Sequence, residues 1–272
     1  MKSQKIKKKN LLKNKDKKKE TKKNIYCSPT KQYDFTCYNY EQLMILKSQW
    51  NINNSLKKIK SNNPKIIWKK LNLFLKEKCE NEKCWLDQEF LLNYKNKFNT
   101  NNIFAPFAPP SWKQNPVEWL NSYDIINVMK QYEKKYPKFK FIGPSPIDFD
   151  KKLEYNQCVW NELCNINLKN LINKGIRYIG IVFNTDTHDK SGSHWICMYI
   201  NLEEKYIFYF DSNADKIPDE ITEFENKLIK QANNIGIKLK LIHNQVEHQK
   251  TNTECGMYVL TVIILLLKKI KK

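Results

Sequence analysis

The chain has 272 residues, of which 41% are hydrophobic and 12% aromatic, so it can bury a real core in one elaborated domain or in two. Its formal net charge is +20, and residues 1–24 carry half of it, because twelve lysines minus Asp16 and Glu20 leave +10. No apolar stretch follows this basic start and no run of about 18 apolar residues occurs, so we expect neither a secretory signal nor a membrane span.

We expect residues 1–24 to form a disordered basic tail. A lysine run of this kind can contact nucleic acid, serve as a nuclear or virion address, or only keep the chain soluble. The abundance of Lys, Asn and Ile is also typical of an AT-rich genome, which weakens any argument from charge. DNA contact through the tail is therefore one of three open alternatives.

Residues 25–110 are predicted to form a helical arm domain that positions substrate. Apolar residues recur with a spacing near 3.6 over 41–50, 65–78 and 85–98, which is typical of helices with one buried face. A cluster of prolines near the end of the arm predicts an extended linker, and we place the second domain at 111–272.

The eight cysteines are predicted to be free thiols, because nothing marks the chain as secreted and disulfides are rare in reducing compartments. Four of them, Cys27, Cys37, Cys79 and Cys84, fall in the arm. A zinc site is an alternative there, but the spacings are irregular and no histidine lies nearby, which favours structural thiols.

The second domain is predicted to have an α+β fold, with a mixed central sheet and a buried helix packed against it. Strands are expected where short apolar runs end in polar turns, and helices where the apolar period is longer. The predicted helices are 117–136, 158–172 and 255–267, and the predicted strands are 177–183, 193–200, 205–210 and 238–242.

Four residues in this domain supply the parts of a thiol acyl-transfer site. Cys255 is the candidate nucleophile, and a thiol needs a nearby base or positive charge to become a thiolate, for which His194 is the candidate. Asp211 would orient the imidazole through its other nitrogen. Gln249 would stabilise the negative oxygen that attack on a carbonyl creates, and Thr253 is a candidate N-cap for the helix that Cys255 begins.

Each residue also has an ordinary structural explanation. A histidine in a strand is often only packed, an Asp-Ser-Asn segment is often only a turn, and a lone cysteine is often a small buried hydrophobe. The order and spacing of all four residue types favour the catalytic interpretation. His188, His243 and His248 compete poorly with His194, while Gln245 is the rival of Gln249.

The order His-Trp, Phe-Asp-Ser, and Gln with five residues before Cys-Gly resembles the Ulp1 and adenain-like cysteine proteases. Segments 119–126, 131–133 and 143–149 resemble the branch that includes the polyprotein protease of African swine fever virus and other large DNA viruses, and the arm resembles that branch less specifically. The resemblance covers about 115–265 and implies the ubiquitin-like-protease fold with a nucleophile helix. It excludes papain-type enzymes, whose nucleophile comes first in the chain.

The resemblance implies a viral cysteine endopeptidase that cleaves core or capsid polyproteins after Gly-Gly, in the virus factory of the host cytoplasm and in the virion. It implies no cofactor and no metal. In deSUMOylating relatives two tryptophans enclose the last substrate residues, and the matching positions are Trp195 and Trp119. The alternatives are a deSUMOylating or deubiquitinating isopeptidase, an acetyltransferase on a related fold, and a catalytically inert nucleic-acid-binding structural protein.

Overall fold

The computed structural model describes residues 26–106 and 108–270, and the predicted tail lies outside this range. The chain divides into two compact units, Met1–Phe107 and Ala108–Lys272, which are described separately below. The sequence predicts the boundary three residues further along, between 110 and 111.

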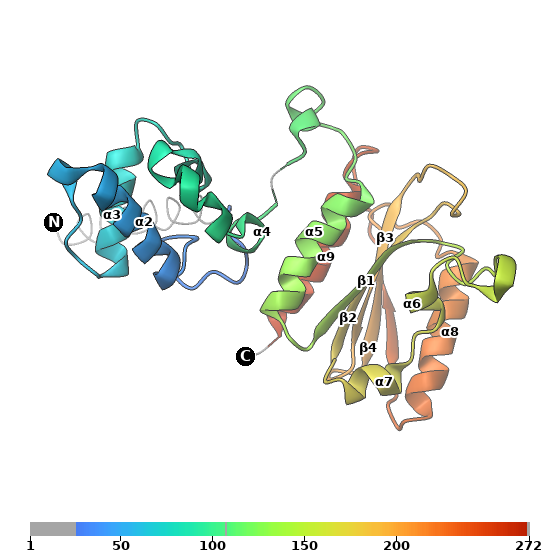
Figure 1. Cartoon of the computed structure of the whole chain (residues 1–272). Helices are drawn as coiled ribbons and strands as arrows, with labels where there is room; N and C mark the ends of the chain where they lie inside the picture. The colour runs from blue at the N-terminus through green and yellow to red at the C-terminus, as the bar shows by residue number, and fades with distance from the viewer. Residues whose placement is uncertain (1–25, 107, 271–272) are drawn as a thin grey trace, which may run out of the picture. The chain divides into compact units, whose positions relative to one another are not determined.

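The first unit is mainly helical (Figure 1). Helix α2 begins with a capping box in which Asn39 and Gln42 bond to each other's backbone, and α3 begins at Pro64 behind the capping side chain of Asn63. The predicted helix over 85–98 is instead two 3-10 helices, because Gln88 takes an extended conformation (φ −80°, ψ 147°) between them. The helices are α2 (Tyr40–Asn53), η1 (Ser55–Lys57), α3 (Pro64–Leu75), η2 (Glu82–Asp87), η3 (Glu89–Lys97) and α4 (Thr100–Ile103).

Six of the eight cysteines form disulfides, so the prediction of free thiols is wrong for these six. The pairs are joined over 10, 5 and 6 residues of sequence, and their Cα atoms lie 4.9, 5.5 and 6.3 Å apart, within the range that a disulfide can bridge. Only Cys197 and Cys255 are free. The disulfides are Cys27–Cys37, Cys79–Cys84 and Cys158–Cys164.

The second unit is built on a mixed five-stranded sheet in the order β1-β2-β3-β4-β5, which confirms the α+β prediction. β1 runs parallel to β2 and β4 runs parallel to β5, while the central strand β3 is antiparallel to both of its neighbours, β2 and β4. All four predicted strands are present, with ends shifted by one or two residues. The strands are β1 (Phe139–Pro146), β2 (Tyr178–Asn184), β3 (Trp195–Asn201), β4 (Tyr206–Phe210) and β5 (Lys240–His243).

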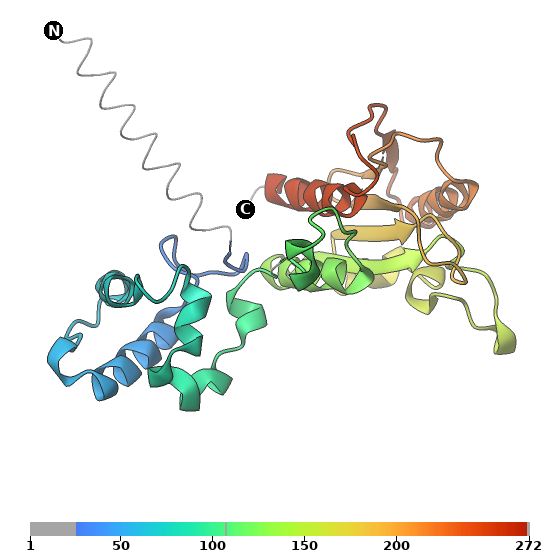
Figure 2. The same cartoon turned by 90° about the horizontal axis from the view of Figure 1, so that it is seen from above.

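Helices cover both faces of this sheet (Figures 1 and 2). Side chains of a strand alternate between faces, so Ile179 and Ile181 of β2 join the core beneath α8, whereas Tyr178 and Val182 join the core beneath α5 and α9. Among the described residues, no helix combines the length and the apolar character that crossing a bilayer requires. The helices are η4 (Pro110–Lys113), α5 (Ser122–Lys135), η5 (Glu154–Asn156), α6 (Asn161–Cys164), α7 (Leu168–Asn173), α8 (Asp219–Asn233) and α9 (Cys255–Lys269).

Three predicted helices of this unit differ from the observed ones. The helix expected from 117 begins at Ser122, because Asn121 and Asp124 form a capping box there. The helix expected over 158–172 is two short helices, since Asn165 ends the first and the Asn167 side chain caps the second. Helix α9 begins at Cys255 with Glu254 before it, so Thr253 is not its N-cap.

Helix α8 was not predicted from the sequence. Its signals are an acidic first turn after Pro218 and apolar residues on one face, of which Ile221, Phe224 and Leu228 are buried against the sheet. These positions are spaced i, i+3 and i+7 with charged residues between them, which is the ordinary pattern of an amphipathic helix, so the signal was present in the sequence.

Candidate active site

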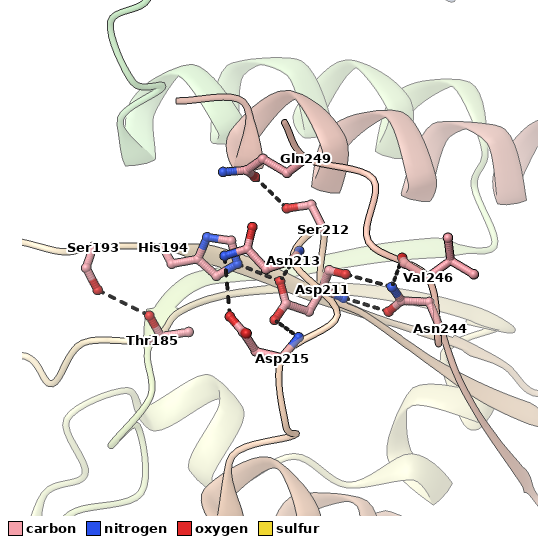
Figure 3. A network of polar contacts seen from close by, with 10 residues as sticks. All are labelled: Thr185, Ser193, His194, Asp211, Ser212, Asn213, Asp215, Asn244, Val246 and Gln249. Carbon is pink, nitrogen blue, oxygen red and sulfur yellow. Dashed lines mark hydrogen bonds and ion pairs between the residues drawn. The ribbon is translucent and has the colours of Figure 1, made fainter. Parts of the chain in front are cut away.

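The β3–β4 hairpin brings His194 and Asp211 together. Cys197 pairs with Phe210 in this hairpin, so the residue just before β3 and the residue just after β4 lie at the same end of the sheet. The His194 Nε2 atom lies 2.6 Å from Asp211 Oδ1, and both side chains are largely buried (Figure 3). The antiparallel pairing that the sequence predicts therefore creates the contact.

Backbone donors hold the Asp211 carboxylate in place. The N–H of Asn213 donates to Oδ1 at 3.0 Å and the N–H of Asp215 donates to Oδ2 at 3.3 Å, both from the turn after β4. Asp211 is 3% exposed. A buried carboxylate with these partners keeps one orientation, so its remaining acceptor capacity is directed at the imidazole.

Asn244, directly after β5, binds the main chain of Asp211 at two points. Asp211 N–H donates to Asn244 Oδ1 at 2.9 Å, and Asn244 Nδ2 donates to the Asp211 carbonyl at 2.7 Å. The side-chain amide thus extends the parallel β4–β5 ladder by one rung. The sequence interpretation did not identify Asn244, and its only signal is an asparagine at the end of the last strand.

The Cys255 thiol lies beside the imidazole. Cys255 is 1% exposed and is the first residue of α9, where backbone N–H groups without helical partners and the helix dipole favour a negative charge. Burial lowers the pKa of His194, but hydrogen bonds to Asp211 and Cys255 and the charges of these two groups outweigh it and raise the pKa to about 9. At neutral pH the imidazole is therefore protonated, and a protonated imidazole beside a thiol favours the thiolate.

Gln249 lies on the segment that leads to α9. It is 5% exposed, and its Oε1 accepts a hydrogen bond from the Ser212 hydroxyl at 2.7 Å. With His194 and Asp211 it lines a cavity of about 390 Å³. The rival Gln245 is exposed and does not line this cavity. The structure thus brings all four predicted residues together and leaves the rival amide outside.

The two predicted substrate-binding tryptophans differ in exposure. Trp195 is 8% exposed, and its Nε1 donates to the Leu120 carbonyl at 2.9 Å, which fixes the indole. Trp119 is 38% exposed and lines both the cavity that His194 and Gln249 border and a neighbouring cavity of about 520 Å³, which Trp195 also lines. Trp119 therefore lies where the two cavities meet.

The other histidines have partners away from the thiol. His188 Nδ1 lies 2.6 Å from Asp148 Oδ2, and His243 Nε2 lies 3.0 Å from Glu225 Oε1. Burial raises the pKa of Glu225. His248 lies beside the rings of Phe210 and Tyr258. In the described part of the chain, no group of His, Cys, Asp or Glu could hold a metal ion.

Three comparisons with known proteins agree with this geometry. The model of the Ulp1 protease family, C-terminal catalytic domain, matches residues 111–271. A putative thiol protease of Acanthamoeba polyphaga mimivirus is 30% identical over 264 residues, which cover 89% of this chain and 84% of the relative. A SUMO-1 cysteine protease of African swine fever virus is 25% identical over 216 residues, which cover 73% of this chain and 78% of the relative.

A solved structure shows the same fold. The crystal structure of a protease of African swine fever virus matches with a TM-score of 0.63 and 18% identity, over 91% of this chain and 87% of that chain. The family match spans more than half of this sequence and ends just beyond the helix that carries the thiol. The chain therefore belongs to the Ulp1 protease family and is a cysteine protease.

Proposed function

We propose that this protein is a viral cysteine endopeptidase that cleaves core or capsid polyprotein precursors after Gly-Gly during virion maturation. The observation that carries the proposal is the contact of His194 with both Asp211 and Cys255. Relatives with viral sources and protease names support it. Its place of action would then be the virus factory in the host cytoplasm and the virion.

The four site residues can perform peptide hydrolysis in two steps. The Cys255 thiolate attacks the scissile carbonyl carbon, and the backbone N–H of Cys255 and the Gln249 amide stabilise the oxyanion. The His194 imidazolium then protonates the leaving nitrogen as the C–N bond breaks, which leaves a thioester. Water gives a proton to the neutral imidazole and attacks the thioester, which releases the carboxylic acid and restores the thiolate–imidazolium pair.

The proposed preference for glycine rests on the two tryptophans. Two indoles over an extended backbone leave little room for a Cβ, so glycine fits and alanine collides. The position of Trp119 in the lining of both cavities supports this role. Trp195 is largely buried, and its indole is held by a hydrogen bond to the Leu120 carbonyl. The ordinary alternative is that Trp195 is only a core aromatic.

A second candidate is an isopeptidase that removes ubiquitin-like proteins. The observation that favours it is the name of a swine-fever relative, which is called a SUMO-1 cysteine protease. Both activities would use the same thiol, base and acid. Only the substrate separates them.

The test compares matched peptides that differ in the two residues before the cleaved bond, together with SUMO and ubiquitin fusions. We expect cleavage of Gly-Gly-Xaa peptides and of the virus's own structural precursors, and severely reduced kcat/KM for Ala-Ala-Xaa. Equal cleavage of both peptides would exclude the clamp. Preference for the fusions over every precursor would favour the isopeptidase.

A matched pair of cysteine variants tests the nucleophile. Cys255→Ala should abolish cleavage without unfolding the protein, because a buried thiol becomes a methyl group. Cys197→Ala removes the other free thiol, which is fully buried in β3, and should retain cleavage. Full activity of Cys255→Ala would contradict the proposed mechanism.

A further inference from the structure

Ser212 is the residue that connects the acid to the amide. It follows Asp211 directly, is fully buried, and donates its hydroxyl proton to Gln249 Oε1 at 2.7 Å. Figure 3 shows Ser212 between Asp211 and Gln249, with the Asp211 carboxylate directed at His194. Ser212 lies in the turn after β4, in which the N–H of Ala214 donates to the Asp211 carbonyl at 3.1 Å, and in this turn the two adjacent side chains reach two different parts of the site.

The Ser212 hydroxyl holds the oxygen end of the Gln249 amide by donating its proton to Oε1. An amide side chain has an acceptor oxygen at one end and a donor nitrogen at the other. Because Oε1 is held by the hydroxyl, Nε2 points away from Ser212, as Figure 3 shows. The reversed orientation would place Oε1 where the oxyanion forms, and two negative oxygens repel each other.

The backbone of Ser212 anchors the same segment. Its carbonyl oxygen accepts hydrogen bonds from the N–H of His248 at 2.8 Å and of Gln249 at 3.0 Å. Removing the hydroxyl therefore leaves the segment attached to the end of β4. What it removes is the constraint on the rotation of the Gln249 side-chain amide.

We propose that Ser212 is a positioning residue for hydrolysis, which holds the Gln249 amide with its N–H groups toward the oxyanion. This proposal rests on the proposed function, which assigns the oxyanion role to Gln249. In Ser212→Ala the amide can turn, so only part of the molecules present a donor. The substitution therefore weakens stabilisation of the transition state and leaves substrate binding unchanged.

The first measurement is a double-mutant cycle. We expect Gln249→Ala to lower kcat by about 10²-fold and Ser212→Ala by about 10-fold, both with little change in KM. The double variant should resemble Gln249→Ala alone, because the hydroxyl acts only through the amide. Ser212→Thr keeps the hydroxyl and should recover most of the activity. Ser28→Ala, at another buried serine, is the control for the substitution itself.

The second measurement separates the amide from the nucleophile. Alkylation of Cys255 by iodoacetamide displaces iodide at a saturated carbon and forms no oxyanion, so it reports on the thiolate and His194 only. Ser212→Ala should keep the wild-type alkylation rate while kcat falls. A parallel fall in alkylation would mean that the substitution disturbs Asp211 and His194, which would overturn the positioning role.

The outcomes distinguish this proposal from the one on which it rests. If Gln249→Ala retains full kcat, the oxyanion assignment in the proposed function is wrong. If Gln249→Ala is impaired but Ser212→Ala is not, or if the two losses multiply in the double variant, Ser212 does not act through the amide. A smaller effect of Ser212→Ala in the Gln249→Ala background supports the proposal.

Discussion

Asp211 accepts three hydrogen bonds with its carboxylate, from His194 and from the backbone N–H groups of Asn213 and Asp215. Its own backbone is held by the side chain of Asn244. The Asp211 carboxylate, which helps to raise the pKa of His194, is thus held in place by two sets of hydrogen bonds. One set comes from the local turn, and the other comes from Asn244, which is 33 residues away in the sequence. The pH dependence and the effect of Asn244 follow from these contacts.

The pKa of His194 predicts the alkaline limit of activity. We expect kcat/KM to fall as the pH rises above about 9, because neutral His194 cannot protonate the leaving nitrogen. In Asp211→Asn a negative charge that raises this pKa is lost, so the alkaline limb should move to lower pH. A pH–rate profile of both proteins checks this, and an unshifted limb in Asp211→Asn would contradict the assignment of the acid.

The same pKa shift predicts how stability depends on pH. Because folding raises the pKa of His194 from 6.5 to about 9, its pairing stabilises the folded protein fully below 6.5 and loses this contribution as the pH rises through about 9. Thermal unfolding at a series of pH values should show this loss in the wild type and a smaller one in Asp211→Asn.

Asn244→Ala removes both hydrogen bonds to the backbone of Asp211. We expect the free energy of unfolding to fall by about 2 kcal/mol, since each net hydrogen bond contributes about 1 kcal/mol. We expect kcat to fall by about 10-fold, because the acid then orients His194 less well. Asn234→Ala, at an exposed asparagine after α8, is the matched control. Wild-type kcat in Asn244→Ala would show that the local turn alone holds Asp211.

Helix α9 places the thiol by packing closely against the segment before α5. A Cβ added at Gly256 would lie 3.0 Å from Leu120 Cβ and 3.3 Å from its Cδ1. The carbonyl of Leu120 also accepts the hydrogen bond from Trp195. The glycine after Cys255 is therefore favoured by this close contact, and not by its backbone conformation.

Gly256→Ala should separate stability from activity. Alanine has a higher helix propensity than glycine, which offsets part of the steric cost in this first turn of α9, so the free energy of unfolding should change little. The displaced Leu120 and Trp119 should lower kcat/KM for Gly-Gly peptides by about 10-fold. Kinetics in a Leu120→Ala background provide the control, because there the added methyl has room and its effect should shrink.

At the scale of the whole molecule, the cysteines divide into bonded and free classes. All eight lie in the described residues, six are in disulfides, and two are free. Burial raises the pKa of the Cys197 thiol, which makes it inert, whereas Cys255 has a protonated imidazole beside it. The two free thiols should therefore react very differently.

Thiol counting by mass spectrometry tests this division. Native, unreduced protein should take up one iodoacetamide, at Cys255, and unfolding without reductant should expose the second thiol, at Cys197. Only reduction should make all eight cysteines reactive. More than two thiols in the unfolded, unreduced protein would contradict the three disulfides.

The basic tail stays a prediction, because residues 1–24 lie outside the described part of the chain. Deleting them should leave turnover of a short peptide unchanged, since they carry charge and no catalytic group. Binding to DNA should weaken, and binding by the full chain should fall steeply with salt if lysines contact phosphates. A full-length variant with these lysines changed to glutamine controls for length. Loss of peptide turnover on deletion would place the tail in the folded enzyme.

The order of the predicted site residues, and the strand or helix beside which each one lies, can be inferred from the sequence alone. The strand pattern around His194 and Asp211 predicts a hairpin, and a hairpin joins its two ends whatever surrounds it. The apolar run after Cys255 likewise predicts a buried helix with the thiol at its start. These are local properties, because a few consecutive residues set the period and the turn.

The contacts between distant residues that hold the site together are visible only in the folded molecule. Asn244 and Asp211 are 33 residues apart and Ser212 and Gln249 are 37 apart, so no local pattern connects them. The disulfides were missed for a different reason: their cysteines are only 5 to 10 residues apart, but the prediction of free thiols rested on a reducing compartment and not on spacing. Hydrogen bonds act over a few ångströms, and only the folding of the chain brings Asn244 to Asp211 and Ser212 to Gln249 within that range.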